Sequence, residues 1–136
     1  MGTEIRNDHS QEAIDTIHKK ILEALELCGQ AAEGYAQVNL TEQHAVDTGA
    51  LRNSISHRVV GKEERVYIGT NIEYAPYIEL GTGKYYPGGR RTAWVYVDDD
   101  GVGHKTEGMQ ARPYLKPAVT DHKAEYKKLL DNALRV

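Results

Sequence analysis

The residues with the clearest chemical potential form a short basic and aromatic loop, Lys84 to Arg91, with the sequence Lys-Tyr-Tyr-Pro-Gly-Gly-Arg-Arg. Its cations could contact phosphates or acidic side chains of a protein partner, and its tyrosines could stack on bases. A solvated connection between two strands would have the same composition. The loop therefore predicts either an interaction surface or a plain linker, and the candidate interface residues are Lys84, Tyr85, Tyr86, Arg90 and Arg91.

Other patterns that could perform chemistry are incomplete. Gly81-Thr82-Gly83-Lys84 is half a phosphate-binding loop, but Ile78 stands where an earlier glycine is required and Tyr85 where Ser or Thr is required. The run Asp98–Asp100 lacks the twelve-residue calcium loop with its closing Glu and is typical of a hairpin tip.

The sequence also lacks a complete catalytic or metal-binding motif. The six histidines have no metal-site spacing with a second ligand nearby. The Gly-x-Ser-x-Gly elbow of serine hydrolases is missing. We expect no catalytic residue, no metal and no cofactor, and therefore no enzyme; a small hydrolase with an unrecognised site is the enzymatic alternative.

Length and composition indicate one globular domain. The chain has 136 residues, 40% hydrophobic and 27% charged, with a net charge of −3 that disfavours a dedicated nucleic-acid binder. No apolar run approaches the roughly 18 residues of a membrane span, and the polar N-terminus predicts a chain that stays in the cytosol where it is made. We expect residues 1–9 to be disordered and residues 10–136 to form the domain.

The first element that must position these residues is a long helix from Ser10 to about Val38. Apolar residues recur at three- and four-residue steps along it, at Ile14, Ile17, Ile21, Leu25, Cys28, Ala32 and Tyr35. Two interpretations remain open: the helix overhangs the domain and offers its stripe to a neighbouring subunit, or the whole stripe packs on its own sheet. Gly29 and Gly34 could weaken or bend its later part.

Alternating segments predict the strands. Residues 54–60 and 65–68 alternate on either side of a polar loop at 61–64, and residues 92–97 and 102–105 flank an Asp-Gly turn. Between the two hairpins, Gly69 and Asn71 allow positive φ in a turn, and a short helix carries Pro76 in its first turn and Gly81 at its end. Tyr74, Tyr77, Ile78 and Leu80 are expected to dock that helix.

The remaining segments are a linker, a short helical turn and a final helix. Residues 39–46 read as the linker, and Asp47 or Thr48 is expected to cap the turn that Leu51 anchors; a catalytic role for Asp47 is the alternative. A last helix is expected to begin near Tyr114, after Arg112-Pro113, with Pro117 in its first turn.

Three ordered blocks carry a family resemblance. They are Asp47-Thr48-Gly49-Ala50-Leu51-Arg52-Asn53-Ser54-Ile55, then Tyr67 to Thr82, then Ala111-Arg112-Pro113-Tyr114-Leu115-Lys116-Pro117-Ala118. With these blocks the chain resembles the small tailed-phage family of gene-product-ten-like proteins, which are head–tail joining or tail-completion proteins. Its matched structural positions would be Asp47, Gly49, Leu51, Arg52, Gly69, Tyr74, Pro76, Gly81, Arg112 and Pro113, with Asp47 as a cap, Gly69 and Gly81 as turn glycines, Tyr74 and Leu80 as packing residues and Pro113 at the start of a helix.

The resemblance implies an α+β fold in which a long N-terminal helix and a C-terminal helix pack on a small antiparallel β-sheet, with a short helix after the second strand. It also implies a virion part that is made in the bacterial cytoplasm and assembles as a ring, commonly a hexamer, against tail-tube and head-connector proteins. DNA would pass through the lumen, and no membrane is involved. The alternative function is a nucleic-acid-binding module that uses loop 84–91.

Overall fold

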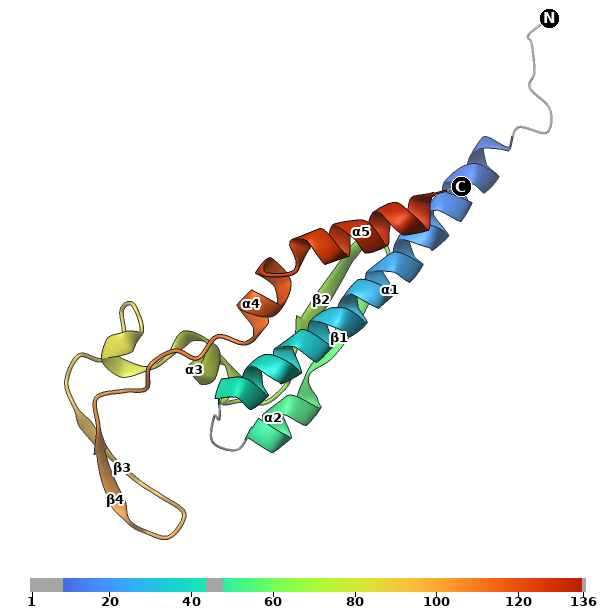
Figure 1. Ribbon diagram of the computed structural model, residues 1–136. Helices are drawn as coiled ribbons and strands as arrows, with labels where there is room; N and C mark the ends of the chain where they lie inside the picture. Colours follow the sequence, from blue (N-terminus) through green and yellow to red (C-terminus); the bar gives the residue numbers. More distant parts are fainter. Residues whose placement is uncertain (1–8, 44–47, 136) are drawn as a thin grey trace, which may run out of the picture.

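The computed structural model describes residues 9–43 and 48–135, and it confirms the α+β fold (Figure 1). The molecule is elongated, with the beginning of the first helix at one end and a two-stranded hairpin at the other. In chain order its elements are α1 (Ser10–Gln43), α2 (Thr48–Ser54), β1 (Ser56–Val60), β2 (Arg65–Gly69), α3 (Ala75–Leu80), the 3₁₀ turn η1 (Gly83–Tyr85), β3 (Trp94–Val97), β4 (Gly103–Thr106), α4 (Leu115–Thr120) and α5 (Lys123–Leu134).

Helix α1 is the element against which the rest of the body packs. It contacts β1, β2, α2, α4 and α5. Its buried residues run from Ala24 to Leu40, whereas Ile14 and Ile17 remain 57% and 49% exposed. The predicted overhang is therefore confirmed for the first turns of the helix, and the interpretation in which the whole stripe packs on its own sheet is wrong.

The same helix is longer than the sequence predicts, because it continues through most of the expected linker to Gln43. Leu40 is fully buried, so its burial favours continuation of the helix. Two side-chain amides then tie this end to the C-terminal region: Asn39 Nδ2 donates to the carbonyl oxygen of Tyr114 at 3.1 Å, and Gln43 Nε2 donates to that of Pro113 at 2.6 Å. The predicted cap Asp47 and most of segment 1–9 lie outside the described residues.

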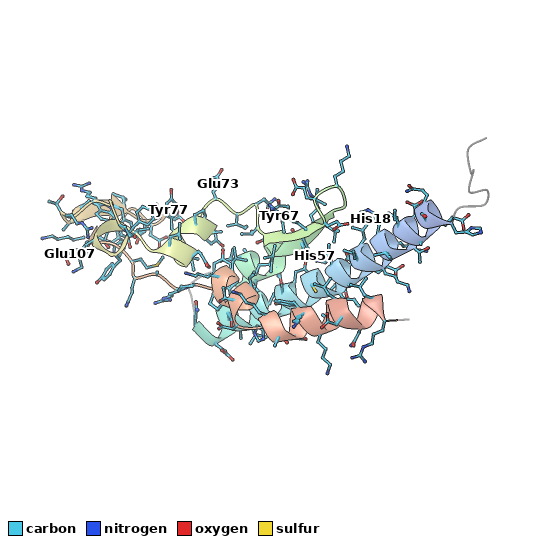
Figure 2. All side chains as sticks on the ribbon, turned by 90° about the horizontal axis from the view of Figure 1, so that it is seen from above. His18, His57, Tyr67, Glu73, Tyr77 and Glu107 are labelled. Carbon is cyan, nitrogen blue, oxygen red and sulfur yellow. The ribbon has the colours of Figure 1, made fainter. Side chains whose placement is uncertain are left out.

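The first hairpin forms the sheet that α1 covers. β1 pairs antiparallel with β2, with Arg58 opposite Tyr67 and Val59 opposite Val66. The predicted alternation is confirmed, since Arg58, Arg65 and Tyr67 are exposed while Val59, Val66 and Ile68 are half-buried. Helices α1, α4 and α5 lie on one side of this hairpin and leave its other side open, as Figure 2 shows from above.

Gly29 allows β1 to approach α1 closely. A Cβ at this position would lie 2.4 Å from Cδ2 of His57 and 2.9 Å from a methyl group of Val66, distances that real Cβ atoms do not adopt. The glycine predicted to weaken the helix is thus the site of its closest contact with the sheet.

A charged cluster lies at that contact. His57, whose side chain is 13% exposed, places Nε2 2.6 Å from the carboxylate of Glu26 and Nδ1 2.9 Å from that of Glu33. The approach to Glu33 has the distance of an ion pair but not the direction of a hydrogen bond. The carboxylates raise the pKa of His57, with the hydrogen bond to Glu26 as the main cause, and partial burial opposes this effect.

The main core lies between the C-terminal half of α1, α2, α3 and α4. Its members are Ala36, Leu40, Leu51, Ile55, Ala75, Ile78, Tyr114 and Ala118. Tyr114 is fully buried, which raises the pKa of its phenol to about 12, and its hydroxyl donates to the carbonyl oxygen of Ala75 at 3.4 Å. Tyr74 packs against this core as predicted.

Helix α3 has the predicted boundaries but not all of the predicted packing. Pro76 lies in its first turn, and Gly81 follows its last residue with φ of 80°. Ile78 is buried, but Tyr77 and Leu80 are 59% and 51% exposed, so the expectation that they dock the helix is wrong. Gly69 does not adopt positive φ, because β2 continues through it in extended conformation.

The side chain of Glu79 in α3 binds the backbone at the start of α4. Its Oε2 accepts hydrogen bonds from the backbone N–H groups of Tyr114 and Leu115 at 2.7 and 3.0 Å, and its Oε1 accepts one from Lys116 at 3.0 Å. The first N–H groups of a helix have no partner within that helix. Glu79 therefore caps α4 from a residue 35 positions earlier in the chain.

The C-terminal region forms two helices where one was predicted. α4 ends at Thr120, whose hydroxyl donates to the carbonyl oxygen of Lys116 and contacts Asp121, a local bonding that competes with a continuous helix. His122 then stacks on Tyr35 of α1 with 3.4 Å between ring centroids, and α5 continues along α1.

The second hairpin stands apart from the first. β3 and β4 form their own two-stranded sheet, with Trp94 opposite Thr106 and Val97 opposite Gly103, and no strand of the described chain joins the two sheets. Figure 1 shows this hairpin beyond α3, away from α1 and α5. None of the described helices combines the length and apolarity needed to cross a membrane.

We predict that Glu79→Gln destabilises the fold by about 1–3 kcal/mol, because three backbone N–H groups lose a charged acceptor. The free energy of unfolding from urea titration measures this loss. Glu73→Gln, at an exposed position in the turn just before α3, is the matched control and should change stability little. Equal stability of the two variants would contradict the capping role.

A second prediction concerns pH. The folded-state pKa of His57 is raised, so its stabilising contribution is complete below the unfolded pKa of about 6.5 and is lost as pH rises through the folded value. Glu26 has a lowered pKa because of its hydrogen bond to His57, so its contribution is present above about pH 4.5 and is lost at more acidic pH.

The stability difference between the wild type and His57→Gln should therefore be larger at pH 6 than at pH 8.5. Urea unfolding at both pH values measures it, and His9→Gln, at an exposed position, is the control. A difference that does not change with pH would show that the ring acts by packing alone.

Candidate functional site

An arm formed by residues 82–111 contains all five candidate interface residues predicted from the sequence. Its two ends are joined by backbone hydrogen bonds: Thr82 N–H donates to the carbonyl oxygen of Met109 at 2.8 Å, and Lys84 N–H donates to that of Glu107 at 3.1 Å. At the junction with the body, Arg112 N–H donates to the carbonyl oxygen of Ile78 at 2.7 Å. The arm is therefore attached through α3, which links it to the core.

Two glycines make this attachment possible. A Cβ at Gly83 would lie 2.1 Å from the carbonyl oxygen of Glu107, and one at Gly81 would lie 2.9 Å from that of Met109. Both residues also have positive φ, which favours glycine. The predicted role of Gly81 at the end of the helix thus extends to a close approach between the two chain segments at the base of the arm.

The three cationic side chains of loop 84–91 each contact another group of the arm. Lys84 Nζ lies 2.6 Å from the carboxylate of Glu107, which raises the pKa of the lysine, and Lys84 in turn lowers the pKa of Glu107. Arg91 Nη1 donates to the carbonyl oxygen of Lys84 at 2.5 Å, and the Arg90 guanidinium lies 5.6 Å from the Trp94 ring centroid. The cations hold the arm together, a role that their sequence pattern does not reveal.

Both tyrosines of the loop are exposed, and Tyr86 lies near the exposed side of α3. A pocket of about 320 Å³ is lined there by Pro76, Tyr77, Leu80, Gly81, Thr82, Gly83 and Tyr86. Its lining is almost entirely apolar apart from Thr82, which suits a protein side chain better than a phosphate. Figure 2 shows Tyr77 on this side of the molecule.

The other matched positions differ in burial. Leu51 is fully buried in α2, whereas Gly49 and Arg52 are exposed. Pro113 lies two residues before α4, which agrees with its predicted place at the start of a helix. Among the described residues, no group of three or more His, Cys, Asp or Glu side chains is arranged to hold a metal ion.

The features that sequence reasoning missed are long-range contacts. Glu79, Glu26 and Glu33 read as ordinary solvent-facing residues of helices, and their partners lie far away in the chain. For Glu79, the only signal was its place in the second resemblance block.

Comparison with known proteins identifies the family of the chain. The model of the HK97-gp10-like family, described as "Bacteriophage HK97-gp10, putative tail-component", matches residues 7–81. This span covers more than half of the chain, contains α1 to α3 and stops at Gly81, where the arm begins. Searches of curated proteins and of solved structures gave no match. The chain therefore belongs to the HK97-gp10-like family of bacteriophage tail components.

Proposed function

We propose that this tail component completes the phage tail or joins it to the head by assembling as a ring, and that residues 10–136 act as one unit. Family membership supports a structural role in the virion. The supporting feature of this chain is its exposed apolar surface, at the first turns of α1, on α3 and on the arm. Side chains of this kind mark protein–protein contacts when they gather on one surface.

A ring requires each subunit to present two different surfaces, one to each neighbour. The described chain has such surfaces at its opposite ends, the α1 overhang and the arm (Figure 1). A hexamer is the ring size that the family resemblance implies. We further propose that the chain is made in the bacterial cytoplasm, that its ring lies between the tail tube and the head connector, and that DNA passes through its lumen.

Within this proposal, Lys84, Tyr85, Tyr86, Arg90 and Arg91 shape a contact surface rather than form a phosphate site. The contacts of Lys84, Arg90 and Arg91 hold the loop that carries the two exposed tyrosines, of which Tyr86 lies beside α3. Reversing the two arginine charges would break both arginine contacts and place like charges in the arm.

We expect a phage that lacks this chain to be rescued by the wild-type gene and by Arg90→Lys with Arg91→Lys, but not by Arg90→Glu with Arg91→Glu. Plaque titre and electron microscopy of the particles measure rescue, and immunoblotting of purified tails shows whether the chain is present. Normal titres with the glutamate variant would exclude a role for these arginines. Tails that assemble and join heads without the chain would refute the proposed function.

The nucleic-acid alternative gains no support from the arm, because Lys84 and Arg91 have partners within it. We expect no salt-sensitive binding of the purified chain to duplex DNA in an electrophoretic shift assay at low salt. Phosphate contacts would instead give binding that weakens steeply as salt is raised. Such binding, abolished by Arg90→Glu with Arg91→Glu, would favour the nucleic-acid module.

A further inference from the structure

The β3–β4 hairpin has one covered face and one bare face. On the first face, Trp94 lies beneath Arg90, Tyr96 stacks on His104, and His104 Nε2 lies 2.7 Å from the carboxylate of Asp98. These groups contact one another within the hairpin, although Tyr96 remains 49% exposed. The polar and aromatic groups of this face are therefore partly satisfied by one another.

The opposite face carries Val95 and Val97, both 67% exposed, with Lys105 and Gly103 across from them. Gly103 adds no side chain to this face, and its Cα side lies beside Val95, where a Cβ would be 3.6 Å from Cγ1. An isolated two-stranded hairpin is marginally stable in water and gains stability when a face is packed. The valine face, defined as Val95, Val97, Gly103 and Lys105, thus lacks the cover that such a hairpin needs.

A groove of matching character lies on the body, between α1 and β1. It has a volume of about 640 Å³, and Leu22, Leu27 and Val59 form its apolar part, with Gly61 at its edge. Lys19 lies toward one end of the groove, and Glu23 and Glu26 lie further along α1. The groove therefore combines apolar side chains with Lys19 and with two carboxylates that lie about one and two turns further along α1, of which Glu26 also pairs with His57.

The valine face has the complementary order of charges. Lys105 lies opposite Val95 at one end, and the acidic tip with Asp99 and Asp100 begins beyond Val97. At about 3.4 Å per residue, Val97 is roughly 7 Å from Val95 along the strand, and the acidic turn follows beyond Val97. At about 1.5 Å per residue, Lys19 and Glu26 are roughly 10 Å apart along the helix. The acidic turn and Lys105 are thus separated by more than the Val95–Val97 spacing, on the scale of the distance from Lys19 to Glu26, so both charges of the hairpin can pair along α1.

The hairpin cannot reach the groove of its own chain. The groove lies near His18 and the β1–β2 turn, whereas the hairpin follows the base of the arm near Glu107, and Figure 2 shows these labelled residues at opposite ends of the molecule. A contact between the two surfaces must therefore join two molecules head to tail. Such a contact is heterologous, and repeated with rotation it closes a ring.

We propose that the valine face of one copy of this chain docks in the α1–β1 groove of the next copy, with Lys105 toward Glu23 and Glu26 and the acidic tip toward Lys19. This contact deepens the proposed ring assembly and rests on it. It assigns the subunit contact to the β3–β4 hairpin, which lies outside the span matched by the family.

Disulfide trapping between two singly substituted full-length chains tests the contact. In a Cys28→Ala background, a Val97→Cys chain is mixed with a Leu27→Cys chain and oxidised, and the heterodimer yield is measured on a non-reducing gel. A disulfide forms only when the two Cα atoms approach within about 7 Å. The matched control replaces Leu27→Cys by Val38→Cys, because both residues are 49% exposed on α1. We expect several-fold more heterodimer with position 27, and equal yields would overturn the proposal.

A charge exchange gives a second readout that a folding defect would not produce. Lys105→Glu in the Val97→Cys chain should reduce the heterodimer yield, and Glu23→Lys in the Leu27→Cys chain should restore it. Failure of the second change to restore the yield would overturn the proposed orientation. Circular dichroism spectra of the variants check that each chain is folded.

The crosslinking experiment and the particle-rescue experiment can fail independently, so the docking proposal and the tail proposal are tested separately. If particles need the chain but the copies do not crosslink at these positions, the tail role stands and the docking proposal fails; loss of Val97→Asp chains from tails would then point to another tail protein as the occupant. If the copies crosslink but particles form without the chain, the docking stands and the tail role fails.

Discussion

The structure depends on one carboxylate placed between two helices. Glu79 of α3 accepts hydrogen bonds from three backbone N–H groups at the start of α4, so the short helix α3 and the C-terminal region are joined although the whole arm lies between them in the chain. A six-residue helix has too few internal hydrogen bonds to persist alone. Each of these two helices is thus stabilised by the other, and the arm between them leaves and rejoins the body at one place.

This arrangement separates a packed body from an outlying arm. Buried side chains are concentrated along α1 and around Tyr114, whereas the arm is held by backbone hydrogen bonds at its base and by contacts among its own charged and aromatic residues. Such a division suits a protein that assembles with others, because the arm can contact another protein without disturbing the buried core that maintains the fold. The family match covers α1 to α3 and ends where the arm begins, so it includes neither the arm nor the C-terminal helices that complete the body.

Local patterns predicted the elements well where a residue's own neighbours decide its structure. The alternation in β1 and β2, Pro76 in the first turn of α3, Gly81 after its end and the Asp-Gly turn of the second hairpin all follow from backbone preferences. Predictions failed where distant contacts dominate. Leu40 extends α1 because it is buried against other elements, Tyr77 and Leu80 stay exposed because α3 docks through Ile78, and Gly29 serves a close approach that periodicity cannot show.

The amino-acid sequence by itself determined the kinds and approximate order of the elements and, through three short blocks, the family, because these depend on neighbours in the chain and on turn chemistry. Only the tertiary structure decided which charges are available. It placed Glu107 beside Lys84, Glu26 beside His57, and Glu79 at the start of α4, and it left the valine face of the arm bare. The physical reason is that pairing and burial depend on distances between residues far apart in sequence, which the order of residues does not specify.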